Sequence, residues 1–127
     1  QKYILDVFEK FGWETNQKNI QIKEMWAIIN KKDDFNVVHT HPNCYLSSAY
    51  YVQAPENCGK FLIESPNSTK RHFFPQIASI NELNIPVAGL DVSEGDLLIF
   101  PGYLPHKVAK NESEKDRIVI SFNVNVV

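Results

Sequence analysis

Three of the four histidines in this sequence fall in two short motifs. His39 and His41 lie two positions apart at the end of a strand-like stretch, just before Pro42. Side chains two apart on a strand project to the same side, so both imidazoles can reach one ion. His106 follows a strand-like run and a Pro-Gly turn, which predicts a third imidazole at a sheet end. Three imidazoles from distant motifs predict a mononuclear metal site, and imidazole suits Fe(II), Zn, Cu or Ni.

Arg117 is the candidate for binding an acid near these histidines. The turn-forming segment from Asn111 to Asp116 predicts a hairpin of strands 106–109 and 117–126, with Arg117 displaced from His106 by about four residues, roughly 13 Å. A guanidinium binds a carboxylate in a bidentate manner and keeps its charge when buried. It could therefore hold the far carboxylate of a short diacid that chelates the metal. The alternative is an exposed charge that pairs with Asp116 or Glu114.

The elements that must position these residues are mostly short strands. Apolar residues at helical spacing predict a flanking helix over residues 1–12, which ends at Gly12. Runs rich in Val, Ile, Phe and Tyr then alternate with turn-forming Asn, Asp, Pro and Gly. The expected strands are 20–22, 25–29, 37–41, 45–53, 60–63, 86–90, 97–100, 106–109 and 117–126. This succession predicts an all-β fold, a jelly roll (double-stranded β-helix), as one domain over residues 1–127 with its core in 20–126.

Two of the expected strands alternate in a way that leaves their orientation open. In the last strand, Arg117 and Ser121 share a mainly polar face, and the opposite face is apolar. Tyr51 belongs to a similar small and polar face of strand 45–53. In one interpretation the polar face meets water. In the other, Arg117, Tyr51 and Ser121 line a cavity while the apolar face packs under the helix.

Composition narrows the class of protein. The chain has 127 residues, 43% of them hydrophobic, and a net charge of −2, which fits one domain and argues against a basic nucleic-acid binder. It contains neither a membrane-spanning apolar run nor a secretory signal, so no membrane partner and a cytoplasmic location are expected. Cys44 and Cys58 are expected to be free thiols. A start at Gln1 indicates a trimmed or partial product.

Several motifs resemble one family. The stretch from His39 through Val52 is similar to the H-x-H-P-(N/H)-x-x-(L/I)-S-G-x-Y-Y-V signature of a group of 2-oxoglutarate/Fe(II) oxygenases related to prolyl 4-hydroxylases. Segments 95–98, 104–108 and 116–123 resemble later motifs of that group and occur in the same order. Segment 25–28 resembles the group's W-A-N-I strand. Ser48 departs from the pattern, since the group usually has Gly there. The resemblance runs from about Ile20 to Asn123.

The resemblance implies a set of roles. His39 and His106 match the two metal-binding histidines, and His41 falls where the wider superfamily places a metal-binding Asp or Glu. Arg117 and Tyr51 match residues that bind the C5 carboxylate of 2-oxoglutarate. The implied cofactors are Fe(II) and the co-substrate 2-oxoglutarate, which reacts with O2 to give succinate, CO2 and a hydroxylated product. A peptide or protein side chain is the implied substrate.

Alternatives remain at this point. His41 either binds the metal in place of the carboxylate, or a different acid completes the site. The chain could also be a three-histidine enzyme resembling thiol dioxygenases, or a jelly-roll module that binds a metal or small acid without turnover. Substrate choice would lie in loops such as residues 65–85, which follow no readable pattern.

Overall fold

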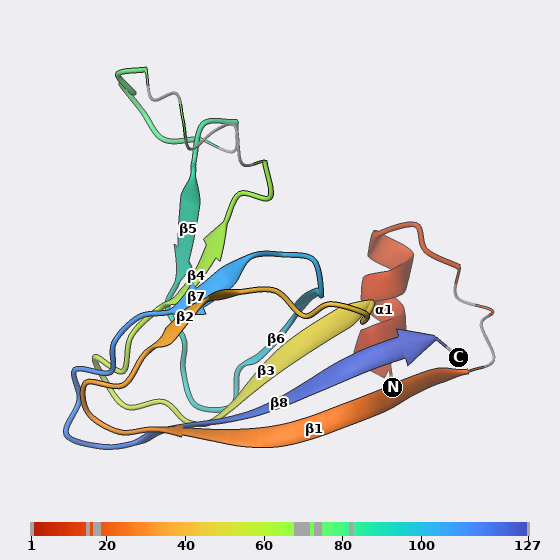
Figure 1. The fold of residues 1–127 in the computed structure, drawn as a ribbon, viewed down its shortest axis with the longest axis horizontal. Helices are drawn as coiled ribbons and strands as arrows, with labels where there is room; N and C mark the ends of the chain where they lie inside the picture. Colours follow the sequence, from red (N-terminus) through yellow and green to blue (C-terminus); the bar gives the residue numbers. More distant parts are fainter. Residues whose placement is uncertain are drawn as a thin grey trace.

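Two four-stranded antiparallel sheets face each other, and one helix lies against the larger sheet (Figure 1). This computed structural model describes residues 2–14, 16, 19–67, 72, 75–81 and 83–126. One sheet has longer strands and is called the larger sheet. Its strand order is β1 (Ile20–Asn30), β8 (Arg117–Val126), β3 (Leu46–Gln53), β6 (Leu97–Pro101). The smaller sheet has the order β2 (Asn36–His39), β7 (His106–Val108), β4 (Phe61–Glu64), β5 (Val87–Leu90). The helix is α1 (Lys2–Lys10).

The predicted jelly roll with an N-terminal helix is confirmed. Its first strand differs from the prediction. Segments 20–22 and 25–29, expected as two strands, form the single strand β1. The register of β1 against β8 shifts between Ile22 and Glu24, which marks a β-bulge. The bulge accommodates the charged Lys23-Glu24 pair that interrupts the apolar alternation, so pairing continues on both sides of it.

The predicted hairpin between strands β7 and β8 is wrong. Strand β7 pairs with β2 and β4 in the smaller sheet, whereas β8 pairs with β1 and β3 in the larger one. The segment between them crosses from one sheet to the other and is held by Asn111, whose N–H donates to Asp34 O and whose carbonyl accepts from the N–H of Asp33. Because the two sheets face each other, Arg117 enters the interior from the sheet opposite His106.

Strand β8 turns its mainly polar face to the interior, as the second interpretation predicts. Its buried positions include Arg117, Val119, Ser121 and Asn123. The alternate side chains pack beneath α1 in a core cluster of Ile4, Phe8, Leu46 and Val124, with Phe122 and Val126 against it. The helix therefore covers one end of the outer face of the larger sheet, and the inner face is left for polar side chains.

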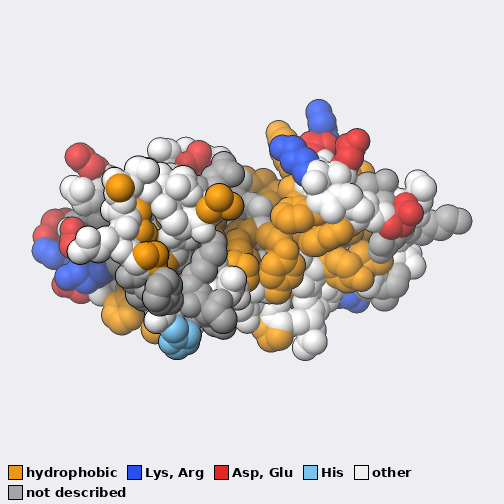
Figure 2. Space-filling view, turned by 90° about the horizontal axis from the view of Figure 1, so that it is seen from above, with side chains coloured by type: hydrophobic (Ala, Val, Ile, Leu, Met, Phe, Trp, Pro, Cys, Tyr) orange, Lys and Arg blue, Asp and Glu red, His pale blue; other side chains and the backbone are white. Residues whose placement is uncertain are grey.

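An aromatic cluster fixes α1 to the sheet. The Phe8 ring lies edge-on to Trp13 at 5.2 Å and stacks on Tyr45 at 6.1 Å between ring centroids. Figure 2 shows hydrophobic side chains gathered on the half of the molecule where α1 lies. Farther along the outer face, Met25 and Ile29 remain 61% and 57% exposed, so α1 covers only part of this apolar surface.

Replacing Phe8 with alanine is expected to lower the free energy of unfolding by about 3–5 kcal/mol, because the ring is fully buried. Chemical denaturation followed by circular dichroism measures the change. Tyr3→Ala on the same helix is the matched control, since Tyr3 is 66% exposed, and should cost under about 0.5 kcal/mol. Equal costs for the two variants would contradict the packing described here.

The segment between β4 and β5 carries the loop expected to select a substrate. Within residues 65–85, positions 68–71, 73, 74 and 82 lie outside the described part of the chain. Of the described residues, His72 is exposed, and the side chains of Ile80 and Leu83 are 73% and 83% exposed. His72 is thus a surface residue.

Two smaller expectations concern the cysteines and membrane spans. Cys44 and Cys58 are free, with Cys58 buried and Cys44 half-buried. Within the described ranges, no helix has both the length and the apolar character needed to cross a membrane.

Candidate functional site

Three histidines converge at one point between the two sheets. One ring nitrogen from each of His39, His41 and His106 lies within 4.8 Å of the others. The Nε2 atoms of His41 and His106 are 3.3 Å apart, and the rings of His39 and His106 are 4.3 Å apart between centroids. His39 and His106 are cross-strand partners in β2 and β7, and His41 follows the end of β2. The predicted convergence of the two motifs is therefore present.

The hydrogen bonds of these rings suit a metal ion. Nδ1 of His39 lies 2.7 Å from Val37 O, and Nδ1 of His106 lies 2.9 Å from Leu104 O. Each Nδ1 must donate its hydrogen to the carbonyl, which leaves the Nε2 lone pair free for a ligand bond. Two nitrogens bound to one ion at about 2.1 Å, at angles of 90–109°, would lie about 3.0–3.4 Å apart. The 3.3 Å between the His41 and His106 nitrogens fits this geometry.

Burial keeps the imidazoles of His41 and His106 in the neutral form that binds metals. Burial lowers the pKa of His106 to about 4, against a smaller opposing effect of its bond to Leu104 O. Burial and the neighbouring His39 also lower the pKa of His41. Neutral imidazole is the ligand form, because a protonated ring has no free lone pair.

Aromatic rings and a tight turn hold the histidines in place. His106 packs between Phe61 and Phe100, with ring centroids at 5.2 and 4.6 Å, and His41 stacks on Trp26 at 5.9 Å. The N–H of His41 donates to Gly102 O at 2.8 Å. A side chain at Gly102 would collide with the carbonyl oxygens of His41 and Cys44, so the close approach of this turn requires glycine.

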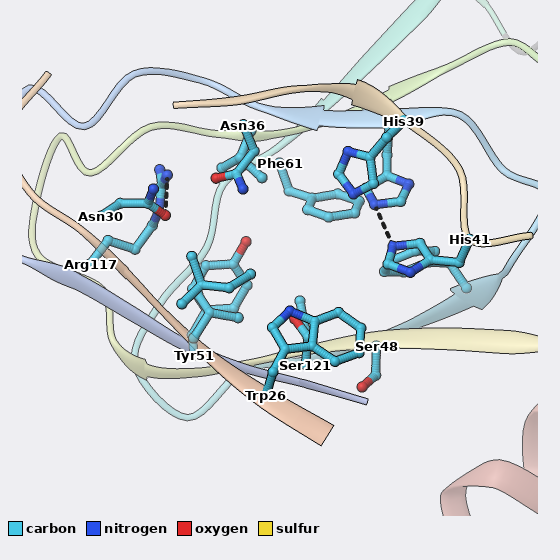
Figure 3. Close-up of a pocket in the computed structure, with 16 residues that line it drawn as sticks. Trp26, Asn30, Asn36, His39, His41, Ser48, Tyr51, Phe61, Arg117 and Ser121 are labelled. Carbon is cyan, nitrogen blue, oxygen red and sulfur yellow. Dashed lines mark hydrogen bonds between the residues drawn. The ribbon is translucent and has the colours of Figure 1, made fainter. Parts of the chain in front are cut away.

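A cavity of about 280 Å³ extends from the histidines between the sheets. Figure 3 shows the imidazoles at one end and Arg117 at the other, with Tyr51 and Asn36 between them. All six residues singled out from the sequence line this one cavity: His39, His41, Tyr51, His106, Arg117 and Ser121. Ser121 and Arg117 are four residues apart on β8, or about 13 Å along the strand. The cavity thus offers a metal-ligating end and a cationic end.

Arg117 is a buried cation, and its hydrogen-bond acceptors among the described residues are all neutral. Its side chain is 1% exposed. Nη1 donates to the carbonyl oxygens of Cys58 and Ala109, and Nη2 donates to Asn30 Oδ1 at 3.0 Å. No carboxylate of the described chain forms an ion pair with it. The alternative of an exposed charge paired with Asp116 or Glu114 is therefore wrong, and the cavity contains a positive charge that forms no ion pair with a described carboxylate.

The hydroxyl groups in the cavity have different surroundings. Burial raises the pKa of Tyr51 to about 12 although the nearby Arg117 lowers it, so the phenol is protonated and can donate a hydrogen bond. Ser121 is buried on the cavity wall. Ser48 bridges strands β3 and β8, because its hydroxyl accepts from the N–H of Phe122 at 3.1 Å and lies 3.2 Å from Phe122 O.

Trp26, Asn30 and Asn36 are among the cavity residues that the sequence did not identify. Trp26 and Asn30 both point inward from β1, opposite Ser121 and Arg117 of β8. Their even spacing along β1 is a period-two signal that could have shown this face. Asn36 also lines the cavity from the start of β2, and its surroundings in the sequence give no such signal.

Comparisons with known proteins agree on one family. Residues 24–123 match the family described as "Putative 2OG-Fe(II) oxygenase". An oxidoreductase of the 2OG-Fe(II) oxygenase family from Burkholderia pseudomallei is 14% identical with a TM-score of 0.65, over 99% of this chain and 58% of that one. HygX from Streptomyces hygroscopicus with nickel and 2-oxoglutarate bound is 17% identical with a TM-score of 0.58, over 84% of this chain and 58% of that one.

A prolyl-4-hydroxylase from Pseudomonas putida also shares the fold, at 11% identity and a TM-score of 0.58, over 84% of this chain and 54% of that one. The chain therefore spans less than two thirds of each of these three structures. No curated protein sequence matches the chain. Because the family model covers most of the sequence, and the two-sheet fold agrees with it, the chain belongs to the 2OG-Fe(II) oxygenase family.

Proposed function

We propose that this protein is an Fe(II)- and 2-oxoglutarate-dependent dioxygenase that hydroxylates an organic substrate. The observation that carries the proposal is a cavity with three imidazoles close enough to bind one metal ion at one end, and at the other an arginine that forms no ion pair with a described carboxylate. The family to which the chain belongs uses Fe(II) and 2-oxoglutarate. A dicarboxylate that chelates a metal through one end and meets a guanidinium with the other matches this arrangement.

In this proposal, His39, His41 and His106 hold the iron. Arg117 binds the C5 carboxylate of 2-oxoglutarate, the phenol of Tyr51 donates to the same group, and Ser121 lines the wall beside it. When bound, Fe(II) and 2-oxoglutarate supply the oxidative chemistry, in which one O2 yields succinate, CO2 and one hydroxylated C–H bond. The aromatic rings of Trp26, Phe61 and Phe100 pack against His41 and His106 and line the ligand end of the cavity.

The proposed substrate is a peptide or protein side chain. A prolyl-4-hydroxylase shares the fold, and this similarity supports the substrate class. Incubation of the iron-loaded protein with 2-oxoglutarate, O2 and a peptide library, followed by mass spectrometry, tests it. A gain of one oxygen atom on specific peptides is expected, and succinate formation with no oxidised peptide would contradict this substrate class.

Succinate formation from 2-oxoglutarate tests the reaction itself. We expect Fe(II)-dependent succinate release, at least at the slow rate of turnover without a substrate. A chelator should abolish it, and fresh Fe(II) should restore it. Absence of both turnover and 2-oxoglutarate binding to the iron form would contradict the proposal.

The three-histidine ligand set also favours a second candidate, an enzyme resembling thiol dioxygenases in which the substrate binds the metal directly. Among the described residues, no carboxylate joins the His39, His41 and His106 group. In this candidate Arg117 would bind the acid group of the substrate, and 2-oxoglutarate would not bind. Oxygen consumption that requires a thiol substrate, but not 2-oxoglutarate, would support it.

Replacing His41 with aspartate tests whether His41 occupies the position of the usual carboxylate ligand. We expect His41→Asp to retain Co(II) binding within about tenfold of the wild type, because a carboxylate oxygen is also a ligand. His41→Ala should bind Co(II) at least about 100-fold more weakly, since it removes a ligand altogether. Absorption titration with Co(II) measures both. Equal losses in the two variants would contradict this position for His41.

A further inference from the structure

The Arg117 guanidinium keeps part of its hydrogen-bonding capacity available. Three of its five N–H groups donate to Cys58 O, Ala109 O and Asn30 Oδ1. Nε–H and the second Nη2 hydrogen have no acceptor in the part of the chain that the structure describes. Because Arg117 lines the cavity, these two donors are available to a carboxylate bound there.

Asn30 is the only one of the three acceptors that belongs to a side chain. It is 8% exposed, lies opposite Arg117 on the neighbouring strand, and presents its Oδ1 to Nη2 at 3.0 Å (Figure 3). An aspartate at this position would offer an oxygen in the same place with a negative charge. The chain has an amide there, which fixes the guanidinium without neutralising it.

A second buried amide holds Asn30 in turn. Nδ2 of Asn111, which is 0% exposed, donates to Asn30 O at 3.1 Å and to Lys115 O at 2.9 Å. Oδ1 of Asn111 accepts from the N–H of Ser113 at 3.0 Å. The crossing between β7 and β8 is thereby tied to the end of β1, which fixes both the Asn30 backbone and the start of the strand that carries Arg117.

Resting on the proposed function, we propose that Asn30 is a positioning and selectivity residue for 2-oxoglutarate: its neutral amide orients Arg117 while leaving the positive charge for the ligand carboxylate. The charge then favours a ligand with a second carboxylate over a monocarboxylate. The ligand, rather than the chain, supplies the negative charge that the buried guanidinium lacks.

Asn30→Asp separates this role from a merely structural one. The substitution keeps every hydrogen bond described for Asn30, because these bonds use Oδ1 and the backbone carbonyl as acceptors. It also creates an ion pair with Arg117 inside the cavity. A structural role therefore predicts that Asn30→Asp resembles the wild type and that Asn30→Ala is the weaker variant. The proposed role predicts the opposite order of affinities.

The test is calorimetric titration of 2-oxoglutarate into the Ni(II)-loaded wild type, Asn30→Asp and Asn30→Ala. We expect about threefold to tenfold weaker binding in Asn30→Ala and at least about 30-fold weaker binding in Asn30→Asp. Ni(II) affinity should stay within about twofold in all three. The midpoint of urea unfolding of Asn30→Asp should equal or exceed that of the wild type, whereas that of Asn30→Ala should be lower.

Gln21→Glu is the matched control, because it makes the same change in charge at an exposed position of the same strand. Its affinity for 2-oxoglutarate should stay within about twofold of the wild-type value. Wild-type affinity in Asn30→Asp, or parallel losses of affinity and stability in that variant, would overturn the inference and leave the proposed function intact. Failure of the wild type itself to bind 2-oxoglutarate would overturn both.

Discussion

Arg117→Leu is expected to weaken 2-oxoglutarate binding by roughly 30-fold to several thousand-fold, which corresponds to about 2–5 kcal/mol. Arg117 is 1% exposed and no described carboxylate pairs with it. It is also the one lysine or arginine among the described residues that line the cavity, so its loss would leave the ligand carboxylate without a cation there. Calorimetric titration of 2-oxoglutarate into the Ni(II)-loaded protein measures the change.

Arg117→Lys is the informative companion to this variant. Lysine keeps the charge but lacks the planar fork, and it cannot reproduce the bonds to Cys58 O, Ala109 O and Asn30 together. We therefore expect an affinity between those of the wild type and Arg117→Leu. Lys60→Met removes an exposed cation and should bind 2-oxoglutarate normally. Wild-type affinity in Arg117→Leu, in a variant that still binds Ni(II), would contradict the assigned role of Arg117.

Removal of the His106 imidazole is expected to weaken metal binding by at least about 100-fold, and to abolish succinate formation with it. His106 is buried, its Nδ1 hydrogen is held by Leu104 O, and its Nε2 lies 3.3 Å from that of His41. Because the ring packs between Phe61 and Phe100, alanine would also leave a void. His106→Gln retains more of the volume and serves as the second variant. Metal titration with Co(II) measures the affinity of each.

His72→Ala is the control for this experiment. His72 is the one histidine of the chain outside the cluster at the cavity, and it is exposed. We expect it to bind Co(II) and form succinate like the wild type. Metal affinity that falls equally in His72→Ala and His106→Gln, or in neither, would contradict the metal site described here.

The sequence predicts the elements around this site better than their assembly. Strand β8 runs from Arg117 to Val126 as expected, because polar and apolar residues alternate over all ten positions and so define both ends of the strand. The alternation could not show which face is interior, since a polar face can meet either water or a polar cavity. The burial of Leu46 and Val124 beneath α1 decides that question, and it depends on a helix distant in the sequence.

The predicted β7–β8 hairpin shows the limit of local reasoning. A short turn-rich segment between two strands favours a hairpin, but here the contacts of Asn111 with Asp33 and Asp34 direct the chain across to the other sheet. The surroundings of Arg117 come from three segments, around Asn30, Cys58 and Ala109, that only the tertiary fold brings together. The histidines were predictable because His39 and His41 lie two positions apart at the end of one strand and His106 follows a distinctive turn.

The most direct test of the central claim is a crystal structure of the protein with Ni(II) and 2-oxoglutarate, with the metal located by anomalous scattering. We predict one metal peak bonded to His39, His41 and His106, and 2-oxoglutarate chelated to it with its C5 carboxylate on Arg117. Metal density elsewhere, or 2-oxoglutarate absent from the cavity or bound without contact to Arg117, would contradict the account.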